Sequence, residues 1–475
     1  MRRKEFSILL VLALLLAMPV MAYDDEDYEA EENDTQVEWI LGYRSVSTDD
    51  SVEKVGEYLS VGDGAVVGLS WFTSPYDKVN WGITFNRIDQ DFWNGGMSLD
   101  LNRRARVDIN VDGMLHRTVH DPVTNLQGVA EIKVNRSTDL EPGAQYRIQR
   151  RLYEIHAEVL TGVEGLSLRA GYRQQTRKGF KQLLTTTHCT SCHTVAQGRE
   201  VNNKLNEATL GVHYTRGVIS LDYQLTGRSF DEYGETPEVF YDRAYHPGNP
   251  AMVTPFNDRL WFQDGFFAAN QVPKIDKTSH RLQAAADFKG GNALDFTMAR
   301  SNTQNKSAML EWDFTGYRGR YTWRVKDGLK VNLSAQRDEI ESDPVLVDLV
   351  NMNGLLAAPV TSYPGFGVLS YQDWRRQVEG DPNITFESFT RSSNYDRTED
   401  RLGADVFWRP RKGTSLRFAA NFDSVDRENV VLADGTGETS TTAVKASWNE
   451  KVGKNLRFMN SLTFKARDNA YANVN

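Results

Sequence analysis

The chain has 475 residues, a formal net charge of −9 and a mean hydropathy of −0.52, and 11% of its residues are aromatic. A soluble chain of this size normally divides into domains, whereas a closed barrel grows by adding strands. The low hydropathy argues against a helical membrane protein, which needs apolar runs of about 20 residues. A polar interior with a thin apolar outer band fits both values, so the composition favours an outer-membrane β-barrel.

The N-terminus carries the one long apolar run of the chain, residues 6–19. Basic residues precede this run, and Val20-Met21-Ala22 follows it as a cleavage site of the small-x-small type. This order predicts a secretory signal peptide over residues 1–22. The alternative, a single N-terminal membrane anchor, is weaker because the apolar run is short and acidic residues follow at once.

The remainder of the chain divides into two predicted parts. Residues 23–37 are rich in Asp and Glu and are predicted to form an acidic tail in the periplasm. Such a tail is either solvated or in contact with a basic partner. Residues 38–475 are predicted to form one all-β domain, a large antiparallel transmembrane β-barrel of the outer membrane.

Apolar and polar residues alternate in segment after segment of the predicted barrel. For example, Ile219, Leu221 and Tyr223 alternate with Asp222 and Gln224. This period puts one set of side chains on each face of a sheet. We therefore expect the first three residues to face lipid and the last two to face the lumen. A soluble β-sandwich shows the same alternation, but the signal peptide and the lack of helical intervals favour the membrane.

Short turns and long loops separate the predicted strands. Gly290-Gly291-Asn292 is typical of the turns, and long polar loops are predicted over residues 227–277 and 338–397. The pattern predicts roughly 16 to 20 strands. The chain ends on Ala472-Asn473-Val474-Asn475, without the aromatic residue that usually closes such a barrel. We therefore expect the barrel to be incomplete at the C-terminus.

Both cysteines of the chain lie in one motif, Cys189-Thr190-Ser191-Cys192-His193. Cys-x-x-Cys-His is the attachment signature of c-type haem, in which the two thiols hold the haem and the histidine binds the iron. Cys189, Cys192 and His193 are therefore candidates for binding one covalent haem c, with His193 as the proximal iron ligand. A disulfide between the cysteines and a zinc site completed by histidines remain as alternatives.

The motif is predicted to lie in a water-exposed rim loop over residues 178–204. The sixth iron ligand is not fixed by the sequence; the candidates are His116, His120, His156, His213, His246 and His280. No nucleophile elbow, phosphate loop or tight carboxylate cluster occurs, and the basic residues form no patch suited to nucleic acid. The sequence therefore predicts neither an enzyme nor a nucleic-acid partner.

Three stretches resemble a known family: Lys54-Val55-Gly56-Glu57-Tyr58, Gly64-Ala65-Val66-Val67-Gly68-Leu69 and Thr236-Pro237-Glu238-Val239-Phe240-Tyr241. In these stretches and in its repeated Trp-turn-Leu hairpins, the chain resembles the outer-membrane porins of porin–cytochrome electron conduits, the MtrB/PioB type. The resemblance extends over most of the mature chain. It implies a barrel that sheathes a multihaem c-type cytochrome in its lumen, keeps outer-membrane lipid away from it, and docks periplasmic and extracellular cytochromes.

The resemblance thus implies electron transfer across the outer membrane. One haem in a rim loop cannot bridge about 30 Å of hydrocarbon, so the partner cytochrome would carry the main electron path. The alternative function is that of a passive diffusion porin or uptake channel, which needs no haem motif. A haem enzyme anchored in a barrel is a third hypothesis, but the sequence shows neither an open haem face nor a distal base.

Overall fold

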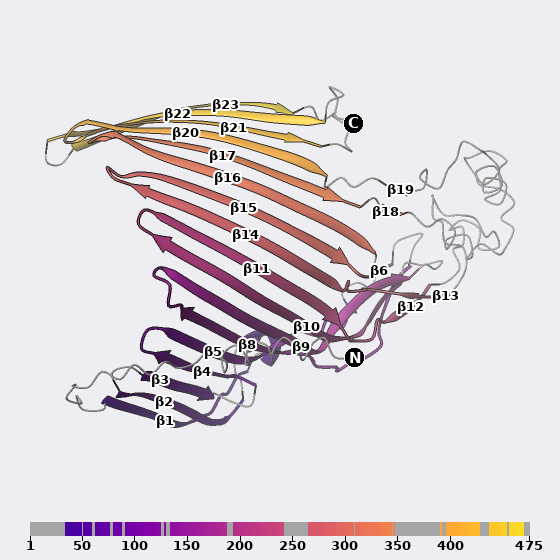
Figure 1. Ribbon diagram of the computed structural model, residues 1–475. Coiled ribbons are helices and arrows are strands. Elements are labelled where there is room, and N and C mark those ends of the chain that lie inside the picture. Colours follow the sequence, from indigo (N-terminus) through magenta and orange to yellow (C-terminus); the bar gives the residue numbers. More distant parts are fainter. Residues whose placement is uncertain are drawn as a thin grey trace, which may run out of the picture.

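The protein, seen in a computed structural model, is built around one large antiparallel β-sheet (Figure 1). The structure describes residues 34–49, 51–58, 62–76, 79–87, 91–124, 128–129, 134–187, 193–241, 265–307, 309–343, 345–346, 390–391, 396–427, 437–453 and 456–469. The signal peptide predicted over residues 1–22 lies outside these ranges. Within them, no helix is long and apolar enough to cross a membrane.

Seventeen of the described strands pair side by side in chain order and form the wall of the molecule. They are β1 (Asp34–Arg44), β2 (Gly64–Tyr76), β3 (Val79–Arg87), β4 (Trp93–Leu101), β5 (Ala105–Thr118), β8 (Tyr146–Leu160), β9 (Leu166–Thr187), β10 (His193–Arg216), β11 (Ile219–Glu232), β14 (Ile275–Phe288), β15 (Asn292–Asn305), β16 (Leu310–Lys326), β17 (Leu329–Ser342), β20 (Arg397–Arg411), β21 (Thr414–Asp426), β22 (Glu438–Val452) and β23 (Leu456–Asn469). Every pairing between consecutive wall strands is antiparallel, so the predicted all-β antiparallel fold is confirmed.

The two ends of the wall differ. At the short-turn end, at the left of Figure 1, two to five residues join neighbouring strands. Several of these turns need glycine, because Gly328 and Gly413 have φ values of +80° and +95°. The loop end carries the smaller elements: α2 (Val52–Val55), β6 (Gly128–Val129), β7 (Val134–Asp139), β12 (Glu238–Tyr241), β13 (Gly265–Ala268), β18 (Val345–Leu346) and β19 (Thr390–Arg391). Outer-membrane barrels have short periplasmic turns and longer extracellular loops.

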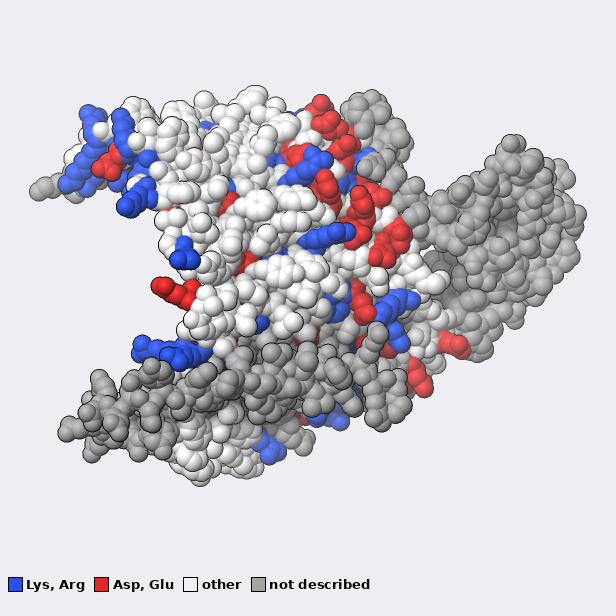
Figure 2. All heavy atoms as spheres, in the orientation of Figure 1, with Lys and Arg blue, Asp and Glu red and all other residues white. Residues whose placement is uncertain are grey.

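The apolar residues of the wall share one face, here called the outer face, and stand in register from strand to strand. One row of backbone partners crosses seven strands through Leu294, Tyr321, Leu333, Ala404, Ala420, Val444 and Phe464. Exposed apolar side chains in a continuous band mark a surface that lipid covers. Figure 2 shows this band as a broad uncharged zone between two charged ends. The wall therefore spans a bacterial outer membrane.

The predicted alternation of faces is confirmed on β11. Ile219, Leu221 and Tyr223 are 49%, 40% and 39% exposed and belong to the outer face. Asp222 and Gln224 lie on the opposite face, here called the inner face, where polar residues dominate. The alternation arises because successive side chains of a strand point to opposite sides of the sheet.

Three predicted boundaries are wrong because strand pairing continues past the change in composition. Residues 34–37 belong to β1 and pair with β2, so the acidic tail predicted over residues 23–37 is shorter at its C-terminal side. Its remaining residues lie outside the described ranges. The long loops also begin later than predicted, since β11 runs to Glu232 and β17 runs to Ser342.

Most of the buried apolar side chains lie at the loop end, some of them where β8 and β10 reach it. Val123 and Tyr146 are 1% exposed, Ala196 is fully buried, and Val201 and Val239 are 3% and 4% exposed. In the membrane-spanning part of the wall, large apolar side chains are exposed on the outer face, because the sheet is a single layer whose outer face meets lipid. The loop end therefore forms its own small core, as a soluble domain does.

Candidate functional site

A hollow of about 540 Å³ lies on the inner face, over β5, β8, β9, β10 and β11. Charged side chains of both signs line it: Arg106, Asp108, Glu154, Glu158, Arg169, Arg173 and Glu207. Alternation along each strand delivers these side chains to one face, and the register then sets them side by side. The hollow can accept a polar or charged solute, or the surface of a protein in the lumen.

The charges of the hollow alternate across neighbouring strands. Arg173 is the backbone partner of Glu154 on one side and of Glu207 on the other. Its Nε lies 3.2 Å from Glu154, and Arg228 Nε donates to Glu207 over 2.6 Å. Cross-strand pairs of opposite charge stabilise a sheet, whereas like charges destabilise it. In this row each guanidinium therefore has a carboxylate beside it.

The strands that carry the cysteine motif project beyond the rest of the wall. β8 pairs with β9 only as far as Phe180, and β11 pairs with β10 only as far as Asn203. β9 continues to Thr187, about 20 Å farther at the usual rise of a strand. We call residues 181–187 and 193–202 the hairpin extension. The prediction of a rim loop over residues 178–204 is therefore wrong, because most of these residues form paired β-strand.

His193, the last residue of the motif, lies at the end of this hairpin extension. Cys189 and Cys192 lie outside the described residues. His193 opens β10, and its backbone pairs with Thr187 of β9 and with Arg136 of β7. Two thiols followed by an imidazole are the donor set of a covalent haem c, so the chemistry of these residues fits that group. The haem assignment stays a prediction.

The loop between β5 and β8 docks on the hairpin extension. β7 adds to β10 as a parallel strand, with Asp139 opposite Ala196. Next to it, the Leu140 amide donates to the Ala196 carbonyl over 2.9 Å. On the other strand, the Gln182 side chain exchanges two hydrogen bonds with the Asp121 backbone, at 2.7 and 2.8 Å. The loop between β5 and β8 thus forms hydrogen bonds with both strands of the extension.

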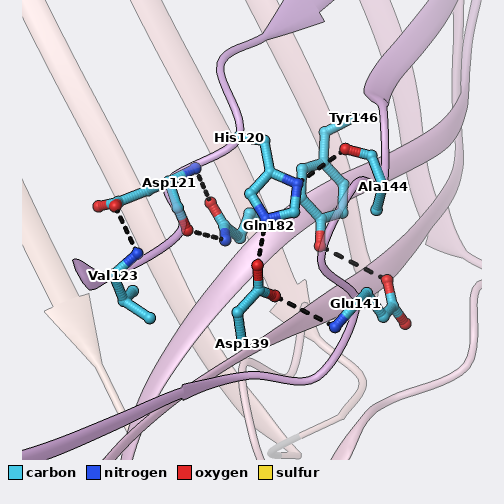
Figure 3. A network of polar contacts seen from close by, with 8 residues as sticks. All are labelled: His120, Asp121, Val123, Asp139, Glu141, Ala144, Tyr146 and Gln182. Carbon is cyan, nitrogen blue, oxygen red and sulfur yellow. Dashed lines mark hydrogen bonds and ion pairs between the residues drawn. The ribbon is translucent and has the colours of Figure 1, made fainter.

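His120 holds the docked loop together, and it lies next to Asp121, which bonds to Gln182 of the extension (Figure 3). Its Nδ1 donates to the Ala144 carbonyl over 2.8 Å, and its Nε2 lies 2.5 Å from Asp139 Oδ2. Both ring nitrogens thus face acceptors, which favours the doubly protonated ring. These contacts, led by the bond to Ala144, raise the pKa of His120 above its usual value. Burial among Glu141 and Asp139 raises the pKa of Tyr146 to about 12.

The other described histidines that could supply a sixth iron ligand lie elsewhere. His116 stacks on Tyr58 at 4.4 Å, His213 lies 3.3 Å from Asp222, and the His280 ring lies 2.8 Å from the Tyr223 hydroxyl. His156 lines the hollow, and His246 lies outside the described residues. None of the four described ones lies on the hairpin extension. In the described part of the chain, no group of three His, Cys, Asp or Glu residues could hold a metal ion.

The docking network was not predicted from the sequence. Asp121, Asp139 and Tyr146 come from a stretch without periodic patterning, so no sequence signal links them to β9 or β10. The alternation predicted that Asp222 and Gln224 face the lumen, but the pairing of the charges in the hollow was not predicted. Both depend on strand register, which the sequence pattern leaves open.

Comparisons with known proteins add little to this picture. No family model matches the chain, and no curated protein matches it. Solved structures match at low TM-scores. OccK10 (OpdN) of Pseudomonas aeruginosa is 10% identical with a TM-score of 0.31, and the match covers 93% of this chain and 95% of that chain. The siderophore receptor PiuA of Acinetobacter baumannii is 10% identical with a TM-score of 0.36, over 92% of this chain and 64% of the receptor.

A third match is the outer-membrane transporter YddB of Escherichia coli, which is 10% identical with a TM-score of 0.34. The match covers 91% of this chain and 60% of the transporter, so the chain spans less than two thirds of that protein and of the siderophore receptor.

Proposed function

We propose that the protein forms a polar passage through the outer membrane, as a porin or uptake channel does. The observation that carries this proposal is the charge-lined hollow on the inner face of a wall whose outer face is apolar. A membrane-spanning strand needs no charged residues for its stability. Paired charges across β8, β9, β10 and β11 are expected where water and charged solutes pass.

Planar-bilayer conductance of the purified full-length protein tests the passage. We expect stepwise channels whose ion selectivity depends on the hollow. Arg173→Glu would place three carboxylates side by side across β8, β9 and β10, because Glu154 and Glu207 flank it. The reversal potential in a salt gradient should then shift toward cation preference. Lys178 lies on the outer-face side of β9, beyond the band. Lys178→Glu should therefore leave the reversal potential unchanged.

Two results would contradict the passage. The first is a correctly folded protein that gives no conductance. The second is an equal shift in reversal potential for both variants, because ion selectivity would then not depend on the charges of the hollow. Heat-dependent mobility on a gel shows whether each variant is folded.

A second candidate function is a sheath for a multihaem c-type cytochrome, and one observation favours it. The sequence carries the motif Cys189-Thr190-Ser191-Cys192-His193, and its last residue, His193, opens β10 at the end of the hairpin extension. When bound there, a haem would supply an electron-accepting iron, while β7 and β9 hold the backbone of His193. The charged inner face would then contact the partner protein instead of water.

Haem staining of the denatured protein separates the two candidates. Thioether bonds survive denaturation, so an attached haem keeps a peroxidase-active band on the gel. The band should vanish when Cys189 and Cys192 are changed to Ser. A colourless band, with thiols that appear only on reduction, would show a disulfide. Co-purification of a multihaem cytochrome, together with loss of conductance, would favour the sheath over the open passage.

A further inference from the structure

Four basic side chains gather on the inner face where the wall meets the hairpin extension: Arg150, Arg177, Lys181 and Arg199. We call them the basic cluster. The register brings them together, because Arg177 is the backbone partner of Arg150, and Lys181 is the partner of Arg199. Both pairs join like charges directly across neighbouring strands, an arrangement that normally destabilises a sheet.

The basic cluster differs from the row of charges below it. Four residues earlier on β9, and on the same face, Arg173 has a carboxylate on each side. Arg177 has Arg150 on one side and the uncharged Asn203 on the other. No described carboxylate forms an ion pair with Arg177 or Lys181. The cations of β9 are therefore neutralised inside the hollow and left unneutralised at its loop-end border.

The acids near the basic cluster do not balance it. Glu232 Oε2 lies 3.8 Å from the Arg199 guanidinium and accepts no hydrogen bond in the described part of the protein, while Glu232 Oε1 accepts the amides of Asn202 and Gly234. Glu57, near the border, bonds to His116 at 3.1 Å. Two carboxylates thus face four cations and a histidine.

Hydrogen-bond donors within the basic cluster also lack acceptors. The Nε atoms of Arg150 and Arg199 are buried and have no hydrogen-bond partner in the described part of the protein; the Nε of Arg173 in the hollow also lacks one, although Glu154 lies 3.2 Å from it. The Arg199 side chain is only 2% exposed. A buried guanidinium donor without an acceptor is costly, so the arrangement calls for an anion. Burial and the neighbouring Arg199 and Arg177 lower the pKa of Lys181, which lies beyond the membrane band.

We propose that the basic cluster binds a small tetrahedral oxyanion, such as inorganic phosphate, at the loop-end entrance to the inner face. Guanidinium groups donate pairs of parallel hydrogen bonds that match the oxygens of such an anion. Arg177 is exposed and half-buried Lys181 lies beside it, so the anion approaches from the lumen side, with Arg199 contributing charge from behind. A role for this site in selecting the solutes of a passage rests on the function proposed above. Phosphate binding by the basic cluster does not depend on that function.

Isothermal titration of the purified full-length protein with inorganic phosphate, at constant ionic strength, tests the site. We expect one phosphate per chain. Arg177→Gln should weaken binding by about tenfold, the effect of losing one charged donor pair. Lys181→Gln should also weaken it, whereas Lys178→Gln should leave it unchanged. Lys178 is the matched control, because it is an exposed cation on the opposite face of β9 and is adjacent to Arg177 in the chain.

Three outcomes would overturn the proposal. One is the absence of phosphate binding by the folded wild-type protein. Another is an equal loss for Arg177→Gln and Lys178→Gln, which would indicate general surface charge. The third is complete displacement of phosphate by an equal concentration of chloride, which a site for tetrahedral oxyanions would not allow. Conductance without phosphate binding would refute the phosphate site but not the proposed passage. Phosphate binding without conductance would refute the passage but not the site.

Discussion

Adjacent residues of a wall strand lie in different surroundings, and Ala419 and Ala420 of β21 show the contrast. The backbone partners of Ala419 are Asp405 and Lys445, two charged residues of the inner face. The partners of Ala420 are apolar and belong to the row of outer-face residues that crosses seven strands. The two positions share residue type, strand and depth, so a substitution at each isolates the effect of the face.

We predict that Ala420→Arg destabilises the membrane-inserted protein by about 2–4 kcal/mol, because the guanidinium would lie in hydrocarbon near the middle of the band. Ala419→Arg should cost less than about 1 kcal/mol, since its side chain would reach water and Asp405 on one side would offset Lys445 on the other. Urea unfolding in lipid vesicles, followed by tryptophan fluorescence, measures both free energies of unfolding. Equal costs at the two positions would contradict the assignment of the faces.

Side-chain orientation could be predicted from the sequence, whereas side-chain partners could not. The period of two placed Asp222 on the inner face correctly. Its partners, Arg169 of β9 and His213 of β10, come from other strands and form an ion pair and a 3.3 Å contact with it. Which residues meet depends on register, and register depends on turn and loop geometry that the alternation does not encode.

At the scale of elements, the strands β9 and β10 were predicted in part. Their lower halves alternate apolar and polar residues because one face meets lipid. Beyond the membrane band this contrast disappears, so residues 178–204 resembled a loop. Pairing between the two strands continues there, and β7 and the β5–β8 loop cover the extension and supply further hydrogen bonds. A strand whose two faces do not differ in polarity gives no period-two signal.

The docking of the β5–β8 loop on the extension is predicted to depend on pH through His120. Its pKa in the folded protein is raised above the unfolded value. The stabilisation is therefore complete below the unfolded pKa and is lost as pH rises through the folded pKa. Hydrogen exchange of the β7 amides, corrected for the intrinsic rate, should show falling protection from about pH 6 to about pH 8.

His120→Gln is the control for this prediction, because glutamine keeps a donor and has no titrating group. In that variant the protection of β7 should be lower at acidic pH and should not fall as pH rises. Amides in the middle of β16, far from the docked loop, should change in neither protein. A pH-dependent loss of protection that persists in His120→Gln would assign the titration to another group.

At the scale of the whole molecule, the difference between the two ends predicts the orientation in the membrane. Short turns face the periplasm in outer-membrane barrels, and long loops face outward. In a protein with Cys189 and Cys192 changed to Ser, we expect Thr236→Cys to react with an impermeant maleimide on intact cells. Lys412→Cys, in a short turn, should react only after the outer membrane is opened. The reverse pattern would show the opposite orientation.

The fold class, the hairpins and the approximate number of strands could be predicted from the sequence, because each depends on local alternation and turn residues. The chemistry of the motif stays a prediction, because a covalent haem, a disulfide and a metal site all use the same two thiols. The docked loop, the paired charges of the hollow and the basic cluster could not be predicted. Each joins residues from strands whose relative register only the folded wall defines.

The direction of the two edge strands constrains how the wall can close. Seventeen described strands alternate in direction, so β1 and β23 point the same way. Edges left unpaired in hydrocarbon are not tolerated. Joining β1 directly to β23 would create a parallel seam in an otherwise antiparallel wall. A closed barrel that is antiparallel all round requires an odd number of strands between these two edges, which makes its total strand count even.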